Sequence, residues 1–213
     1  MITRYQQFLM VITVILLTPA LSLAQETATD QDVIMFRGFQ KGQKDESASV
    51  TFKAPPGHIE SPSIAKKNGL FKYYALPPSE EGKSPLSIVT VAFKKKSSKP
   101  GLRNLDDFIS TDISYFRDHY KNATVSQASL PKDVTTHLSE DGIPFETYLT
   151  KGNVKGEGKQ FLGDGMVLFF ETPGGFWSVS WTAPEKLIKE APDSFLFFLK
   201  DMRVNLKSKK PAS

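Results

Sequence analysis

The sequence predicts an α+β fold in which helices cover both faces of an antiparallel sheet. Apolar side chains occupy both alternating positions along Leu86 to Phe93, and a strand of that kind is buried on both faces. From Leu105 the apolar residues take the i, i+3, i+4, i+7 spacing of a helix. Two strands, 166–172 and 176–182, flank a Pro-Gly-Gly turn that is typical of a hairpin. Helices before and after such an antiparallel block form an α/β/α sandwich.

The composition indicates one domain whose core needs no disulfide. The chain has 213 residues, 14 glycines, 14 prolines, no cysteine and a formal net charge of +4. One domain is the default at this length. The lack of cysteine excludes disulfides, thiol nucleophiles, thiolate zinc sites, iron-sulfur clusters and a lipidated N-terminal cysteine.

Residues 1–24 are predicted to be an export signal that is cleaved near Ala24. Arg4 precedes an apolar run from Phe8 to Leu17, Thr18-Pro19 ends it, and Ser22 and Ala24 supply small residues for cleavage. A helix of that run spans about 15 Å, whereas a bilayer core is about 30 Å thick. No later segment has the length of a membrane span, so we expect a periplasmic or secreted protein. An uncleaved N-terminal anchor is the alternative.

Residues 25–49 are polar and are predicted to form a flexible leader before a single domain over 50–205. Their apolar patch, Val33 to Phe36, has the composition of a short edge strand. Strands are predicted at Val50 to Ala54 and at Leu70 to Leu76, because turn-forming prolines and glycines follow each of them.

The helix that begins at Leu105 has the clearest boundaries. Asn104 is a suitable N-cap, and Asp106 and Asp107 place negative charge in the first turn. His119 then lies in the last turn, where positive charge is favourable. We expect the helix to end close to residue 120.

The second half of the chain is predicted to be a four-stranded meander followed by two helices. Residues 151–165 are rich in glycine and indicate a long connection. Pro184 and Pro192 suit the first turns of the two helices. The predicted strands are 123–128, 145–150, 166–172 and 176–182, the helices are 183–190 and 192–204, and 206–213 is a basic tail.

Three local features, together with this layout, resemble the PsbP-like fold and its DcrB-like periplasmic members. They are the Pro-Pro-Gly turn at 55–57, the aromatic strand FWSVSW that runs into Thr182-Ala183-Pro184, and the helix from Phe195 to Val204. The chain has His58 where members of the family often have Trp. The family is united by its fold, so the resemblance implies no catalytic residue.

The sequence contains no recognisable catalytic, cofactor or metal motif, so we expect a protein that is not an enzyme. His58, His119 and His137 lack the spacing of a metal site and are expected to be single surface residues. Lys159 is followed by Gln160, where a phosphate-binding P-loop needs Ser or Thr. No GxSxG elbow is present either. A pair of catalytic carboxylates has no sequence signature, which leaves a metal-independent hydrolase open.

The candidate binding residues are a basic rim and an apolar loop. The rim consists of Lys94, Lys95, Lys96 and Lys99, and the loop carries Phe161 and Leu162. These residues favour an exported accessory protein of the bacterial envelope that binds a protein or an anionic envelope component, and not nucleic acid. A rim that merely protects a sheet edge from aggregation is the competing interpretation.

A carrier or sensor of a small apolar ligand is the alternative function, with the ligand held between sheet and helices. Trp177, Val179 and Trp181 share one face of their strand. We expect this face to belong to the core and not to a ligand site, because buried aromatic side chains dominate cores of this size.

Overall fold

The computed structural model describes residues 43–77, 87–154, 165–183 and 193–207. The chain divides into two compact units, 1–33 and 34–213, and all described residues lie in the second. Their elements are, in chain order, β1 (Ala48–Thr51), β2 (Ile59–Glu60), α1 (Pro62–Asn68), β3 (Lys72–Leu76), β4 (Ser87–Lys95), α2 (Leu105–His119), β5 (Tyr120–Ala128), α3 (Lys132–Glu140), β6 (Phe145–Val154), β7 (Gly165–Thr172), β8 (Gly175–Thr182), α5 (Asp193–Asp201) and β9 (Arg203–Leu206).

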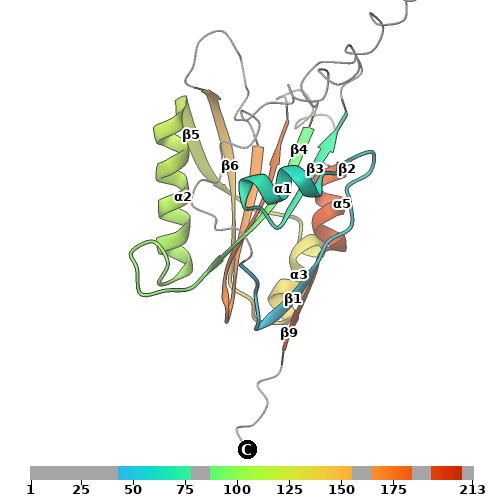
Figure 1. Cartoon of the computed structure of the whole chain (residues 1–213), viewed down its shortest axis with the longest axis vertical. Helices are drawn as coiled ribbons and strands as arrows, with labels where there is room; N and C mark the ends of the chain where they lie inside the picture. The colour runs from blue at the N-terminus through green and yellow to red at the C-terminus, as the bar shows by residue number, and fades with distance from the viewer. Residues whose placement is uncertain (1–42, 78–86, 155–164, 184–192, 208–213) are drawn as a thin grey trace, which may run out of the picture. The chain divides into compact units, whose positions relative to one another are not determined.

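The main sheet has seven strands in the order β2-β3-β4-β8-β7-β6-β5. Every pair of neighbours is antiparallel. Helix α2 lies on one face, while α3 and α5 lie on the other (Figure 1). A second sheet pairs β1 with β9. The predicted fold class, an antiparallel sheet with helices on both faces, is confirmed.

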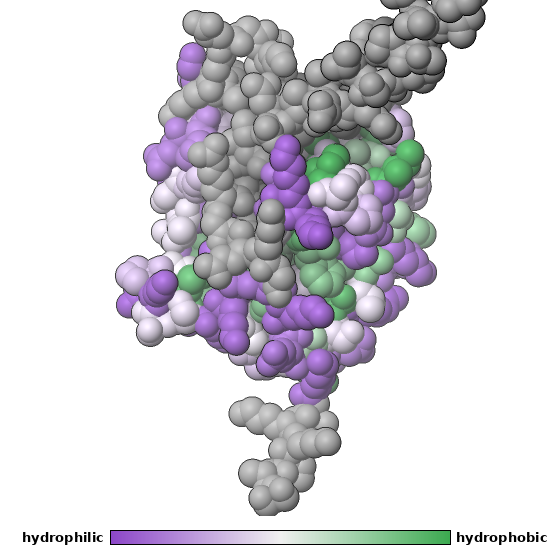
Figure 2. Space-filling view, viewed as in Figure 1, coloured by the Kyte–Doolittle hydropathy of each residue, from purple (hydrophilic) through white to green (hydrophobic). Residues whose placement is uncertain are grey.

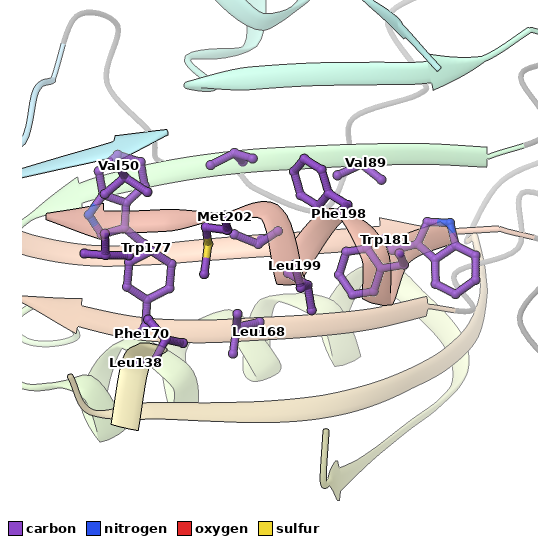
Figure 3. Packing of buried hydrophobic residues seen from close by; sticks show 14 of the residues in the cluster. Val50, Val89, Leu138, Leu168, Phe170, Trp177, Trp181, Phe198, Leu199 and Met202 are labelled. Atoms are coloured by element: carbon purple, nitrogen blue, oxygen red, sulfur yellow. The ribbon is translucent and has the colours of Figure 1, made fainter. Parts of the chain in front are cut away.

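The larger part of the core lies between the sheet and the layer of α3, α5, β1 and β9. Trp177, Val179 and Trp181 are each at most 1% exposed, as the alternation along this strand predicted. Phe198 and Leu199 of α5 pack onto the same face (Figure 3). Phe195 stacks on Trp181 with ring centroids 5.4 Å apart. The tryptophans are therefore part of the core.

The smaller part of the core lies between the sheet and α2. Phe108 stacks on Phe176 and meets Phe169 edge to face, with centroids 5.3 and 5.9 Å away. Asn104 caps the helix as predicted, because its Oδ1 accepts a hydrogen bond from the Asp107 amide at 2.8 Å. The strand β4 is consequently buried on both faces, as its sequence indicated.

Helix α1 lies where the sequence predicted no regular element. Pro62 occupies its first turn, and Gly69 ends it with φ 70°, a left-handed conformation that suits glycine. Ala65 is the buried residue of the helix. The sequence signal is weak because so short a helix shows less than one full repeat of apolar spacing.

The four strands of the predicted meander, β5 to β8, pair antiparallel in chain order, but helix α3 lies in the connection between β5 and β6, where no helix was predicted. Val134 and Leu138, four residues apart, are buried, and the helix packs against α5 and β9. Threonines between these two positions reduce helix propensity, and no side chain caps the first turn. Tertiary packing therefore decides this helix more than local preference does.

The C-terminal helix and the leader also differ from expectation. Helix α5 ends at Asp201, and Arg203–Leu206 forms β9, which pairs with β1. The strand β1 begins at Ala48, two residues before the predicted domain boundary. The helix predicted at 183–190 and the tail from 208 lie outside the described residues. Pairing with β1, at the other end of the domain, supplies the strand β9, which the sequence of its own segment does not indicate.

Within the described ranges, no helix combines the length and apolar character that a bilayer crossing requires.

Candidate functional site

The predicted lysine rim lies where β4 leaves the main sheet, and the fold adds two further lysines to it. The Lys95 amide donates a hydrogen bond to Gln43 Oε1 at 3.0 Å, which places Lys44 beside the rim. The Lys207 amide donates to the Ser47 carbonyl at 2.8 Å. We call this region the basic end; its lysines are Lys44, Lys94, Lys95, Lys96, Lys99 and Lys207.

The lysines of the basic end differ in how freely they present charge. Lys44, Lys95, Lys99 and Lys207 are exposed. Lys96 Nζ instead lies 2.5 Å from Glu171 Oε1 and 5.6 Å from the centroid of the Phe176 ring. Figure 2 shows hydrophilic side chains gathered over the lower part of the face, where the β4–α2 connection lies in Figure 1.

Lys94 is half-buried. Burial lowers the pKa of its ammonium group, and the nearby charge of Lys99 lowers it further. Both effects disfavour the charged form of Lys94. The solvent-facing positive charge of the basic end therefore comes mainly from the four exposed lysines. Phe161 and Leu162, the predicted apolar loop, lie outside the described residues.

Asp45 anchors the basic end to the sheet. Its carboxylate accepts hydrogen bonds from the hydroxyls of Ser47 and Thr172 and from the indole of Trp177. Burial raises the pKa of Asp45, but these hydrogen bonds outweigh burial and hold the pKa below its usual value. The sequence does not indicate a role for this residue, because two of its partners, Thr172 and Trp177, lie far away in the chain.

A small recess lies between α2 and the strands β5, β6 and β7. Asp112, Tyr148 and Thr150 line it together with apolar side chains. Its volume is about 10 Å³, which is room for a single water molecule and not for an organic ligand. Thr150 Oγ1 is buried there without a hydrogen-bond partner among the described residues.

Burial in this recess raises the pKa of Asp112 to about 8. The carboxyl group is therefore largely protonated at neutral pH, and it can donate a hydrogen bond. No described side chain bonds to it. A perturbed carboxyl group in a recess is a candidate functional group. The sequence analysis missed Asp112, because the spacing of the helix does not show how the β5–β6 side of the sheet surrounds it.

His58 and Ser87 form a hydrogen-bonded pair, so His58 is not the single surface residue that we expected. The Pro56 carbonyl, 3.1 Å from His58 Nδ1, accepts only, so Nδ1 carries the proton of the neutral ring. His58 Nε2 then accepts from the Ser87 hydroxyl at 2.9 Å. Burial lowers the pKa of His58 more than the Pro56 carbonyl raises it, which favours the neutral ring.

A serine hydroxyl that donates to a histidine has the connectivity of a nucleophile and its base. Ser87 is 2% exposed, however, and its Oγ also accepts a hydrogen bond from Trp181 Nε1 at 2.7 Å. Both features hinder attack on a substrate. The pair therefore acts as a structural link between the β2 side of the sheet and the core.

In the part of the chain that the structure describes, no three His, Asp or Glu side chains are grouped so that they could hold a metal ion.

No protein-family model and no curated protein matches the sequence. The fold resembles that of cyanobacterial PsbP. The solution structure of CyanoP from Synechocystis sp. PCC 6803 has 13% sequence identity and a TM-score of 0.45, and the likeness covers 79% of this chain and 98% of that chain. At this identity the likeness concerns the fold alone.

Proposed function

We propose that the protein is an exported, non-enzymatic binding or accessory protein of the bacterial envelope. The basic end is its contact surface for an anionic partner, either an acidic protein segment or an anionic envelope component. One observation carries the proposal: exposed lysines from three separate segments converge there, namely Lys44, Lys95 with Lys99, and Lys207. Glu46 is also exposed in this region, and the balance stays positive.

Two lysines of the basic end are poorly suited to carry the proposed interaction. Lys96 is paired with Glu171, and Lys94 is half-buried, so replacing either would disturb the fold as well as the surface. The exposed lysines have no such role in the core. Salt screens the interaction between exposed charges beyond about 10 Å at 0.1 M, and the screening distance shortens as the salt concentration rises. Binding through the basic end should therefore weaken at higher salt.

The test replaces the four exposed lysines, Lys44, Lys95, Lys99 and Lys207, together by glutamine. The matched control changes four exposed lysines elsewhere, namely Lys66, Lys67, Lys121 and Lys132, and so alters the net charge equally. Binding to an envelope extract and to vesicles that contain anionic lipid is measured over a series of salt concentrations. The proposal expects the first variant to lose affinity and salt dependence and the control to keep both. Equal behaviour of the two variants would overturn it.

Export has its own test. Cleavage after Ala24 should give a mature chain that begins at Gln25 in the envelope fraction, and its intact mass decides this. A chain that retains residues 1–24 would instead be held at a membrane by its N-terminus.

A further inference from the structure

A carboxyl group lies in the apolar stripe by which α2 packs on the main sheet. Phe108 and Phe116 of this stripe are each at most 5% exposed. Asp112 is four residues from each of them, so it lies on the same side of the helix. This side of a helix ordinarily carries apolar residues, because a polar group that is buried there needs a hydrogen-bond partner. The partner of Asp112 must therefore lie in the layer between helix and sheet.

Strand β6 brings a hydroxyl group to the same layer. Tyr148 packs against the apolar cluster beneath α2, and the alternation along the strand places Thr150 on the same face. Thr150 pairs with Val125 of β5 and with Gly165 of β7, and it is 9% exposed. Its Oγ1 is buried and finds no hydrogen-bond partner among the described residues. Buried hydroxyl groups are almost always hydrogen-bonded, either to protein or to ordered water.

The recess between α2 and the strands β5, β6 and β7 brings these two polar groups together. Asp112 and Thr150 both line it, and apart from Tyr148 the rest of its wall is apolar. Its volume of about 10 Å³ is at the lower limit for one water molecule and excludes any organic molecule. A purely apolar cavity stays dry, whereas a cavity that offers two or more polar partners holds water. The recess has both the size and the chemistry of a water site.

We propose that this recess is a binding site for one ordered water molecule, which bridges the Asp112 carboxyl group on α2 and the Thr150 hydroxyl group on β6. The water accepts a hydrogen bond from the carboxyl group and donates one to Thr150 Oγ1.

The donors and acceptors around the recess match this bridge. Burial raises the pKa of Asp112 to about 8, so at neutral pH the carboxyl group is largely protonated and carries a proton to donate. The water can then give one of its own protons to Thr150, whose hydroxyl oxygen is an acceptor. Tyr148 does not compete as a donor, because its hydroxyl already donates to Glu146 Oε2 at 2.5 Å.

The bridge joins two elements that otherwise meet through apolar surfaces. Phe108 of α2 contacts Phe169 and Phe176 of the sheet by aromatic packing. Aromatic packing does not satisfy the polar groups of Asp112 and Thr150. One water molecule satisfies both at once, and it adds a directional link between the middle of α2 and the β5–β6 side of the sheet.

A crystal structure of the complete chain, at a resolution that shows ordered water, tests the site directly. The proposal expects a water molecule roughly 2.7–3.2 Å from both Thr150 Oγ1 and a carboxyl oxygen of Asp112. A dry recess would overturn the proposal. So would a direct hydrogen bond from Thr150 to another part of the chain.

Thermal unfolding at pH 6 gives a second test, in which the sign of the effect is decisive. Thr150→Val removes the hydroxyl group and nearly keeps the shape of the side chain. Loss of the bridge should lower the unfolding midpoint by about 2–4 °C, which corresponds to one hydrogen bond in a chain of this size. Thr124→Val, at an exposed threonine of the neighbouring strand β5, is the matched control and should not lower the midpoint. A higher midpoint for Thr150→Val would show a hydroxyl group without any partner and would overturn the proposal.

A double-mutant comparison shows whether the partner of Thr150 is the water shared with Asp112. Asp112→Leu keeps the branched shape of the side chain and removes its polar atoms. In that background Thr150→Val should lower the midpoint by less than half as much as in the unaltered chain, because the bridge is already broken. An equal decrease in both backgrounds would assign Thr150 a different partner and overturn the proposal. If a variant does not fold, the crystal structure of the unaltered chain decides alone.

Discussion

The indole Nε1 of Trp177 donates a hydrogen bond to the carboxylate of Asp45, with the two atoms 3.1 Å apart. The hydroxyl of Thr172 donates to the same carboxylate at 2.5 Å. Together they fasten the segment before β1 to the hairpin of β7 and β8. A Cβ atom at Gly174 would meet the Asp45 side chain, so a larger residue in this turn would push the carboxylate out of its hydrogen-bonded position. The position of the basic end depends on this buried link.

Asp45→Ala should destabilise the domain, because it leaves the Trp177 indole N–H buried without an acceptor. Loss of one partner from a buried hydrogen bond costs about 1–3 kcal/mol. The pKa of Asp45 is lowered in the folded state, so this stabilisation is complete above the unfolded pKa of about 4 and is lost as the pH falls below it. Thermal melts from pH 3 to pH 7 check this, with the exposed neighbour variant Glu46→Ala as control. Parallel pH profiles for both variants would contradict the expectation.

Ser87→Ala should also destabilise the domain. It removes the acceptor of the Trp181 indole and the donor to His58 Nε2. We expect a loss of about 1–3 kcal/mol in the free energy of unfolding. Urea denaturation measures it against Ser49→Ala, an exposed serine in β1. A fluorophosphonate probe that labels Ser87 in the unaltered protein would show that this serine is accessible and reactive after all.

Asp112→Asn should make the domain more stable at neutral pH. Burial raises the pKa of Asp112 to about 8 in the folded state, whereas its ordinary value is 3.8. Folding therefore takes up a proton between these two values, and stability falls as the pH rises from 4 to 8. Tyr148, which faces the same recess, stays neutral in this range because burial and Glu146 raise its pKa to about 12.

The Asn variant lacks this titration, so its advantage should vanish near pH 4 and be largest near pH 8. Asp112 keeps partial contact with solvent, and we expect about 1–2 kcal/mol instead of the full effect of the shift. Urea denaturation at pH 4, 6 and 8 measures the difference in the free energy of unfolding between the variant and the unaltered protein. Asp118→Asn, which changes an exposed residue of the same helix, is the control. A constant difference at all three pH values would show that the Asp112 carboxyl titrates normally.

Gly175→Ala should disrupt the β7–β8 hairpin. An added Cβ atom would meet the backbone carbonyl oxygen of Lys94 and the ring of Phe93. Backbone cannot move aside as a flexible side chain can, so a loss of about 3 kcal/mol or more is expected. Circular-dichroism melts measure the loss. Gly142→Ala, whose Cβ atom would meet nothing within 4 Å, is expected to cost less, because only its positive φ causes strain.

The sequence by itself determined the features that repeat along the chain. The two-sided apolar strand β4, the capped helix α2 and the alternating hairpin strand with Trp177 and Trp181 were all predictable, because spacing of apolar residues reports directly on burial. The helices α1 and α3 were not, since each is short and is stabilised mainly by its packing. The strand β9 was mistaken for helix, because its pairing with β1 joins the two ends of the domain.

Tertiary structure alone decided which side chains meet. The four lysines of the rim were visible in the sequence, but Lys96 is neutralised by Glu171, and Lys44 and Lys207 join from elsewhere. Asp45, Asp112 and Ser87 carried no sequence signal at all. A carboxylate or hydroxyl acquires its pKa and its partners from groups that are distant in the chain. Local spacing therefore predicts which residues are buried, and the fold determines what those buried residues contact.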